Sequence, residues 1–214
     1  MKSVVATTHG GPEVLRIVDA PTPVAGEGQV LVRVAASSVN PLGWHELRGK
    51  PSQVRIMRGL TRPKSSSTGK GSDVAGTVEA VGPGLSRFAV GDEVIGFGKA
   101  AWSELMVVGE AGLVLKPPGL SMTDARGVGV AATTALQGLR RGGLVAPPTR
   151  GPGEVEPMPP RVLIIGASGG VGTFAVQIAQ MLGAHVTSVT STRNLELVAR
   201  LGADDVSSTT REPR

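Results

Sequence analysis

The spacing of hydrophobic positions changes abruptly in the last third of the chain. An uninterrupted apolar run covers Val162 to Ile165 and stops at a cluster of glycines. Residues 173–182 then carry apolar side chains at helical spacing, and residues 185–190 form a second run of apolar and hydroxyl side chains. An uninterrupted apolar run is typical of a strand buried on both faces, whereas a period of about 3.6 residues predicts a helix. The pattern predicts a β-α-β unit with a tight turn before its helix.

Short strands and strong turns dominate residues 1–120. Residues 4–6 and 15–18 flank a His-Gly-Gly-Pro sequence, which predicts an opening hairpin. Residues 29–37 alternate partly and are rich in valine, so they form the clearest strand of this part. Further strands are expected through Val78 and Val81 and over residues 93–96, 102–108 and 113–116. We therefore expect a β-rich first domain.

A bridging helix and a long loop are expected next. Ser121 is a typical helix start, and residues 128–139 contain enough Ala, Leu and Val for a helix. Proline and glycine are too dense after Gly142 for a regular element, so we expect an exposed inserted loop at 143–160. The expected organisation is a first domain (1–120), a connecting segment (121–160) and a second, α/β domain (161–214).

Composition places the chain among globular proteins with an aliphatic core. The 214 residues include 31 Gly but no Tyr and no Cys, which excludes disulfides and thiolate zinc sites. The first residues lack a long apolar core, and no later stretch is long enough to cross a membrane. We therefore expect a cytoplasmic protein without membrane contact.

The net charge of +5 comes mostly from one segment. Between Arg48 and Lys70 there are seven basic residues and no acidic or aromatic ones. A solvated loop is one interpretation, and a basic rim that attracts anions to a neighbouring cleft is another. Because the segment has no aromatic side chains for base stacking, we do not expect nucleic acid as a partner.

The glycine cluster between the last apolar run and its helix is a candidate anion site. Free N–H groups and the positive end of the helix dipole meet at such a turn. In a β-α-β context the expected ligand is the pyrophosphate of a dinucleotide, and a tight turn without a ligand is the alternative. The residues expected to contact the ligand are Ala167, Ser168, Gly169, Gly170, Val171 and Gly172.

Asn40 lies where the strand over residues 29–37 has ended, next to Pro41, which stops a β ladder. Strand ends deliver side chains to loop-lined clefts, so Asn40 is a candidate ligand-contacting residue. An asparagine before a turn is equally typical of a turn-capping amide. Both interpretations stay open on the residues alone.

Five blocks in a fixed order extend these observations to nearly the whole chain. They are residues 38–41, 71–94, 132–136 and 166–172, and residues 191–194 together with 201–204. In these blocks the chain resembles the zinc-free, NADPH-dependent quinone oxidoreductase branch of the medium-chain dehydrogenase/reductase superfamily. The resemblance implies an α/β plus β fold, in which a GroES-like partly open β-barrel is followed by an incomplete Rossmann parallel sheet.

The resemblance also implies roles for single residues. In the family a threonine matching Thr134 approaches the nicotinamide, and a packing residue is the alternative here. Asn40 would be the catalytic residue, contacting the substrate carbonyl or the nicotinamide amide. Zinc-dependent relatives have cysteine and histidine where Asn40 and Ser72 stand, so no metal is expected. The family usually has proline in place of Gly129, and we expect the glycine to loosen the helix entry.

The residues after the second strand of the β-α-β unit favour NADPH over NADH. An NAD-binding protein typically places an acidic side chain there to bind the ribose 2′-OH. This chain has Ser191, Arg193 and Asn194 instead, and hydroxyl and guanidinium groups suit a 2′-phosphate. The alternative for Arg193 is a plain surface charge.

Two Rossmann strands and the beginning of a third are expected up to residue 214. In the resembled family later strands complete the nicotinamide wall and the sixth carries the dimer interface, so we expect a truncated chain whose homodimer is in question. One hypothesis is an NADPH-dependent oxidoreductase that transfers hydride to a small-molecule quinone or α,β-unsaturated carbonyl (an enone). The other is a catalytically inert remnant that binds a dinucleotide or serves as an interaction module.

Overall fold

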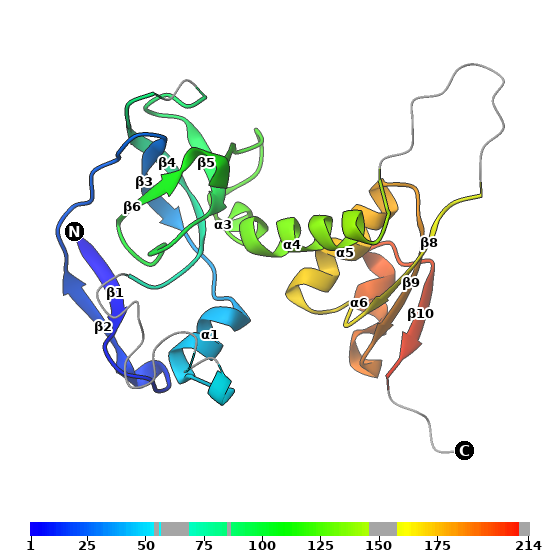
Figure 1. Ribbon diagram of the computed structural model, residues 1–214. Helices are drawn as coiled ribbons and strands as arrows, with labels where there is room; N and C mark the ends of the chain where they lie inside the picture. Colours follow the sequence, from blue (N-terminus) through cyan, green and yellow to red (C-terminus); the bar gives the residue numbers. More distant parts are fainter. Residues whose placement is uncertain (54–55, 57–68, 85–86, 146–157, 210–214) are drawn as a thin grey trace. The chain divides into compact units, whose positions relative to one another are not determined.

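The computed structural model describes residues 1–53, 56, 69–84, 87–145 and 158–209. The chain divides into two compact units, Met1–Val130 and Ala131–Arg214 (Figure 1). Most of the basic segment 48–70 and most of the inserted loop 143–160 lie outside the described residues. The interpretations of these two segments therefore stay predictions.

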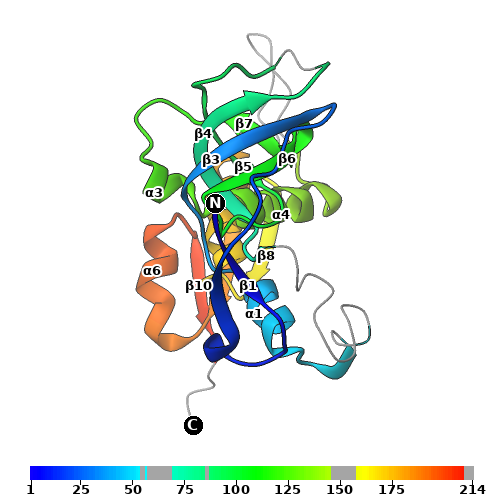
Figure 2. The ribbon, with the colours of Figure 1, turned by 90° about the vertical axis from the view of Figure 1, so that its left-hand side faces the viewer.

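The first unit is built on a five-stranded antiparallel sheet in the order β6-β3-β4-β5-β7. Its strands are β3 (Gln29–Ala36), β4 (Asp73–Val81), β5 (Glu93–Phe97), β6 (Leu105–Gly109) and β7 (Leu113–Leu115). Among the described residues the sheet does not close, and its two longest strands, β3 and β4, pair side by side (Figure 2). The strands expected between residues 29 and 116 are confirmed.

A separate hairpin opens the chain. Strands β1 (Lys2–Ala6) and β2 (Leu15–Asp19) pair antiparallel, with Val4 opposite Ile17. A single 3-10 turn, η1 (Pro12–Val14), lies between them, and a second one, η2 (Glu110–Gly112), connects β6 to β7. The predicted opening hairpin is confirmed.

Aliphatic side chains fill the core of the first unit. Alternate residues of β3 and β4 point into it, because successive side chains of a strand face opposite sides. The buried cluster consists of Val30, Val32, Val74, Val78, Phe88, Val94, Ala101, Met106, Val108 and Leu113. Phe88 is the one aromatic member, as the composition led us to expect.

Helices of the first unit with fully described bounds follow β3 and β7 along the chain. They are α1 (Pro41–Arg48), α3 (Met122–Ala125) and α4 (Val128–Arg141), and the boundary between the units falls within α4. Ser121 caps α3, since its Oγ accepts a hydrogen bond from the Asp124 N–H at 3.1 Å. At the start of α4, a Cβ on Gly129 would lie 2.2 Å from the carbonyl oxygen of Gly96. Glycine therefore permits a close backbone contact here, and the expectation that Gly129 loosens the helix entry stays a prediction.

The second unit is a three-stranded parallel sheet in the order β10-β9-β8. The elements are β8 (Arg161–Ile165), α5 (Gly170–Met181), β9 (His185–Thr190), η3 (Thr192–Asn194), α6 (Leu195–Arg200) and β10 (Asp205–Ser208). The helix α5 packs on the sheet through Val176 and Ala179, which are fully buried with Val186 of β9. This arrangement confirms the β-α-β unit and the start of an incomplete Rossmann sheet.

Within the described residues, one face of β8 is covered and the other is exposed. Val162 and Ile164 belong to the apolar cluster that includes α5, whereas Leu163 and Ile165 are 62% and 74% exposed. The prediction of a strand buried on both faces is therefore wrong for this chain. The apolar run does form a strand. Among the described residues, however, no element covers the side of this strand from which Leu163 and Ile165 project.

Two glycines of α4 allow a test of the tight helix entry. Gly129→Ala should lower the free energy of unfolding by about 2 kcal/mol, because the new methyl group must displace the Gly96 carbonyl. Gly138 has no atom within 4 Å of an added Cβ, so Gly138→Ala should raise the free energy of unfolding by about 0.5 to 1 kcal/mol. Urea denaturation of both variants measures the difference. Equal effects of the two substitutions would show that the backbone contact at Gly129 is not tight.

Candidate functional site

The turn between β8 and α5 is shaped by two glycines that no other residue can replace without strain. Gly166 has a φ of 77°, in the left-handed region that glycine adopts at little cost. A Cβ on Gly172 would lie 2.3 Å from the carbonyl oxygen of Gly166. The first glycine thus makes the tight turn, and the second lets the first turn of α5 pack against it.

Gly170 differs from these two glycines. Its φ is not positive, and an added Cβ would meet no protein atom within 4 Å. Neither backbone conformation nor packing within the described chain explains a glycine here. An open surface in front of Gly170 is what a ligand needs for close approach to the backbone.

The first turn of α5 offers unpaired donors to this open surface. Gly169 is the N-cap, so no side chain caps the helix, and its first turn holds no acidic residue. Among the described residues no group accepts a hydrogen bond from the amides of residues 170–172. Three free N–H groups at the positive end of a twelve-residue helix form a suitable site for a phosphate group.

A cluster of hydroxyl and amide groups ties the turn to the end of β9. The Ser168 Oγ accepts hydrogen bonds from Thr190 Oγ1 at 2.6 Å and from Asn194 Nδ2 at 2.9 Å. Asn194 Nδ2 also donates to Ser191 Oγ at 3.1 Å. The structure thus brings together three residues that the sequence proposed separately: Ser168, Ser191 and Asn194.

Thr190 is a member of this cluster that sequence reasoning missed. It is only 2% exposed and is the last residue of β9. The available signal was its place at the carboxyl end of a strand in which every second residue is buried, since ligands of parallel sheets bind at that edge.

The other proposed contact residues fall into two groups. Arg193 is exposed on η3, and among the described residues no ion pair engages its guanidinium group. Ala167 is fully buried and its N–H donates to the Val189 carbonyl, and Gly172 is buried as well, so both shape the turn from within. Val171 is 41% exposed beside the open surface. Thr134 is exposed on the part of α4 that belongs to the second unit.

Asn40, the candidate of the first unit, is the N-cap of α1, but its side chain makes no capping hydrogen bond. Its Nδ2 instead donates to Ser38 Oγ at 3.2 Å and to Asp73 Oδ2 at 2.9 Å. The interpretation of Asn40 as a turn-capping amide is therefore wrong. Asp73 is fully buried, and no sequence pattern distinguished it.

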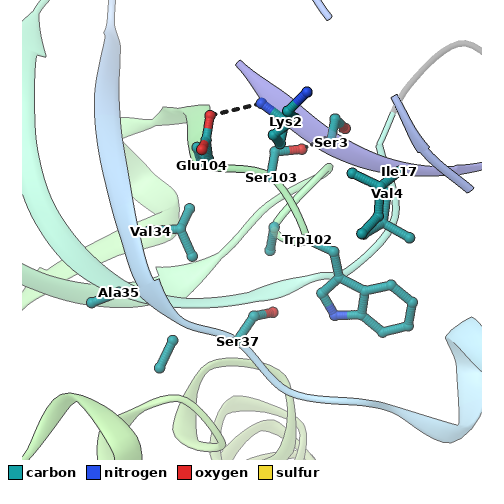
Figure 3. Close-up of a pocket in the computed structure, with 12 residues that line it drawn as sticks. Lys2, Ser3, Val4, Ile17, Val34, Ala35, Ser37, Trp102, Ser103 and Glu104 are labelled. Carbon is teal, nitrogen blue, oxygen red and sulfur yellow. Dashed lines mark hydrogen bonds between the residues drawn. The ribbon is translucent and has the colours of Figure 1, made fainter. Parts of the chain in front are cut away.

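Two hollows in the first unit lie near this group. One has a volume of about 370 Å³ and is bordered by β1, the end of β3 and residues 101–104; there the Lys2 N–H donates to Glu104 (Figure 3). The indole N–H of Trp102, which lines it, donates to the carbonyl of Ser38 at 3.0 Å. The other, of about 540 Å³, lies between Ser38 and the residues around α3. Ser37, in the loop after β3, lines both of them.

Shifted pKa values mark groups away from the glycine turn. Burial lowers the pKa of Lys70, which lies just before β4. A hydrogen bond from His185 lowers the pKa of Asp205, which starts β10 and so lies at the opposite edge of the sheet from the turn. In the part of the chain that the structure describes, no three His, Asp or Glu residues gather as metal ligands would, and no helix has the length and apolarity to cross a bilayer.

Comparison with known proteins agrees with this geometry. Residues 26–137 match the alcohol dehydrogenase GroES-like domain family. The chain is 34% identical over 204 residues to the chloroplastic quinone-oxidoreductase homolog of Spinacia oleracea, covering 92% of this chain and 57% of the relative. The chain belongs to the medium-chain dehydrogenase/reductase superfamily, in its quinone oxidoreductase branch, and spans little more than half the length of that relative.

Solved structures show the same fold. The quinone oxidoreductase of Pseudomonas syringae superposes with a TM-score of 0.78 at 30% identity, over 99% of this chain and 59% of that one. A mycobacterial protein solved in complex with NADPH superposes with a TM-score of 0.74 at 28% identity, over 99% of this chain and 60% of that one. The expected fold, a GroES-like domain followed by a partial Rossmann sheet, is confirmed.

The different reasons for glycine at positions 170 and 172 can be tested by stability. Gly172→Ala should lower the free energy of unfolding by about 2 kcal/mol or more, because the methyl group overlaps the Gly166 carbonyl. Gly170→Ala should change it by less than about 1 kcal/mol, because the methyl group enters open space. Urea denaturation followed by circular dichroism measures both. A large loss of stability in Gly170→Ala would mean that packing, and not an open surface, requires that glycine.

Proposed function

We propose that the chain is an NADPH-dependent oxidoreductase that transfers hydride to a quinone or an α,β-unsaturated carbonyl. The observation that carries this proposal is the glycine turn, with its open surface at Gly170 and three unpaired amides at the start of α5. The spinach relative, a quinone-oxidoreductase homolog, and the Pseudomonas structure, a quinone oxidoreductase, support it. So does the complex of the mycobacterial neighbour with NADPH.

The residues present fit a dinucleotide phosphate. The pyrophosphate would be bound by the amides of residues 170–172, with the N-cap Gly169 next to them and Ser168 holding the turn. Ser191, Arg193 and Asn194 would bind the ribose 2′-phosphate. No carboxylate lies at positions 191–194 to repel a phosphate, and the Arg193 guanidinium is not taken up by an acidic partner among the described residues.

NADPH, when bound, supplies the hydride, and the chain's own residues bind and orient the ligands. We propose that Asn40 contacts the reacting ligands and that Thr134 lies against the nicotinamide. We also propose the domain limits 1–120, 121–160 and 161–214. The cytoplasmic location and the homodimer stay predictions, since the spinach relative is named as chloroplastic and nothing observed bears on assembly.

A second candidate function is an inert dinucleotide-binding module. The uncovered apolar side chains of β8, Leu163 and Ile165, favour it, because a site that excludes water needs covered walls. The two candidates differ in chemistry and share the binding site. They are therefore separated by activity after binding has been shown.

Calorimetric titration of the purified chain with NADPH tests the proposal. We expect saturable binding, and oxidation of NADPH when a quinone such as menadione is added. Binding without oxidation of NADPH by a quinone or an enone would favour the inert module. No binding of either NADPH or NADH would refute both candidates.

Arg193→Ala should separate the two dinucleotides. Loss of a charge-assisted contact to the 2′-phosphate should weaken NADPH binding about tenfold or more and leave NADH binding nearly unchanged. The matched control is Arg200→Ala, since Arg200 pairs with Glu196 on α6 at 2.9 Å. Equal effects of Arg193→Ala on both dinucleotides would show that Arg193 is a plain surface charge.

A further inference from the structure

Asp73 is a fully buried carboxyl group whose hydrogen bonds join three parts of the first unit. It starts β4, and its Oδ1 accepts a hydrogen bond from the Val130 N–H of α4 at 2.6 Å. Its Oδ2 accepts from the Ser38 hydroxyl and, at 2.9 Å, from Asn40 Nδ2. Both carboxyl oxygens therefore have partners, and the loop after β3 is held to the first turn of α4.

These contacts determine which end of the Asn40 amide points inward. The Asp73 oxygen accepts, so the nearer amide atom must be the nitrogen, which donates. Ser38 uses its proton on Asp73, so its oxygen is free to accept the second N–H of Asn40, at 3.2 Å. With both N–H groups engaged, Oδ1 is the polar atom that Asn40 has left, and among the described residues no donor contacts it.

We propose that Asp73 is a positioning residue that presents Asn40 to ligands as a hydrogen-bond acceptor. This inference rests on the proposed function, because it concerns the ligand of that site. A quinone or enone carbonyl also only accepts, so it cannot bond to Asn40 Oδ1. The nicotinamide carboxamide carries an N–H2 group, which can donate a hydrogen bond to Asn40 Oδ1. Of the two partners that the sequence left open for Asn40, the geometry selects the nicotinamide amide.

Substitution of Asp73 by Asn should reverse the amide. The Val130 N–H keeps an oxygen opposite it, so the new amide nitrogen must face Ser38 and Asn40. Two amide nitrogens cannot bond to each other, and Asn40 would turn its oxygen inward and its N–H2 group outward. The double variant Asp73→Asn with Asn40→Asp exchanges the two roles of the wild-type pair. Residue 73 then donates, residue 40 accepts, and an oxygen of residue 40 is again left to face outward.

Two measurements test the proposal. The first is the NMR signal of the Asn40 side-chain N–H2, assigned by its loss in Asn40→Asp. We expect slow hydrogen exchange in the wild-type chain and fast exchange in Asp73→Asn. The second compares binding of NADPH with binding of its 3-acetylpyridine analogue, in which a methyl group replaces the carboxamide N–H2. The wild-type chain should prefer NADPH about fivefold, as expected for one hydrogen bond.

The variants give the preference a matched control. Asp73→Asn should abolish the preference for NADPH over the 3-acetylpyridine analogue, and the double variant should restore that preference. A merely structural role for Asp73 would not produce this pattern. Ser37→Ala removes a hydrogen bond of 2.6 Å to the Asp73 backbone carbonyl and leaves the carboxyl contacts in place, so it should keep the preference. Circular dichroism verifies the fold of each variant, and the wild-type signals remain decisive where a variant does not fold.

The outcomes separate this proposal from the proposed function. Fast exchange of the wild-type Asn40 N–H2 would overturn the role of Asp73, whatever the chain binds. Slow exchange with equal binding of NADPH and its analogue would overturn the carboxamide as partner. If the wild-type chain binds neither dinucleotide, the proposed function fails and the carboxamide fails with it, while the exchange measurement still decides the orientation of Asn40.

Discussion

The space between Gly172 and the carbonyl oxygen of Gly166, too small for a methyl group, sets how closely α5 can start after β8. This steric constraint places the first turn of α5 next to the carboxyl ends of β8 and β9. Its consequence is that the unpaired amides of residues 170–172 face the same edge of the sheet as Ser168 and Thr190. A backbone contact therefore prepares the anion site before any side chain contributes to it.

The first unit depends on a polar contact of comparable importance. Asp73 starts β4 and accepts hydrogen bonds from the loop after β3 and from the first turn of α4. Burial of a carboxyl group is costly unless its hydrogen bonds are satisfied, and here both oxygens have donors. The close approach of Gly129 to Gly96 lets α4 come near enough to supply one of them. The position of Asn40 follows from these contacts.

The pattern of hydrophobic, polar and turn-forming residues predicted most of the fold, because this pattern depends on the helices, strands and turns that neighbouring residues form. The glycine cluster between an apolar run and a helical period fixed the β-α-β unit, and β9 was predicted with its observed limits. Contacts between distant residues could not be predicted in this way. Asp73 and Thr190 look ordinary in sequence, and their roles depend on partners that lie 33 and 22 positions away. The exposed side of β8 was missed because an apolar run does not reveal whether a second layer covers it.

The central claim is that the start of α5 binds the phosphates of a dinucleotide, and amide NMR tests it most directly. NADPH should shift the N–H signals of residues 170–172 and of Ser191 to Asn194, because the phosphates would bond to the first group and lie beside the second. Adenosine 2′-monophosphate, which lacks the 5′-phosphates and the nicotinamide, should shift the second group alone. Saturating NADPH that leaves the signals of residues 170–172 unmoved would contradict the account.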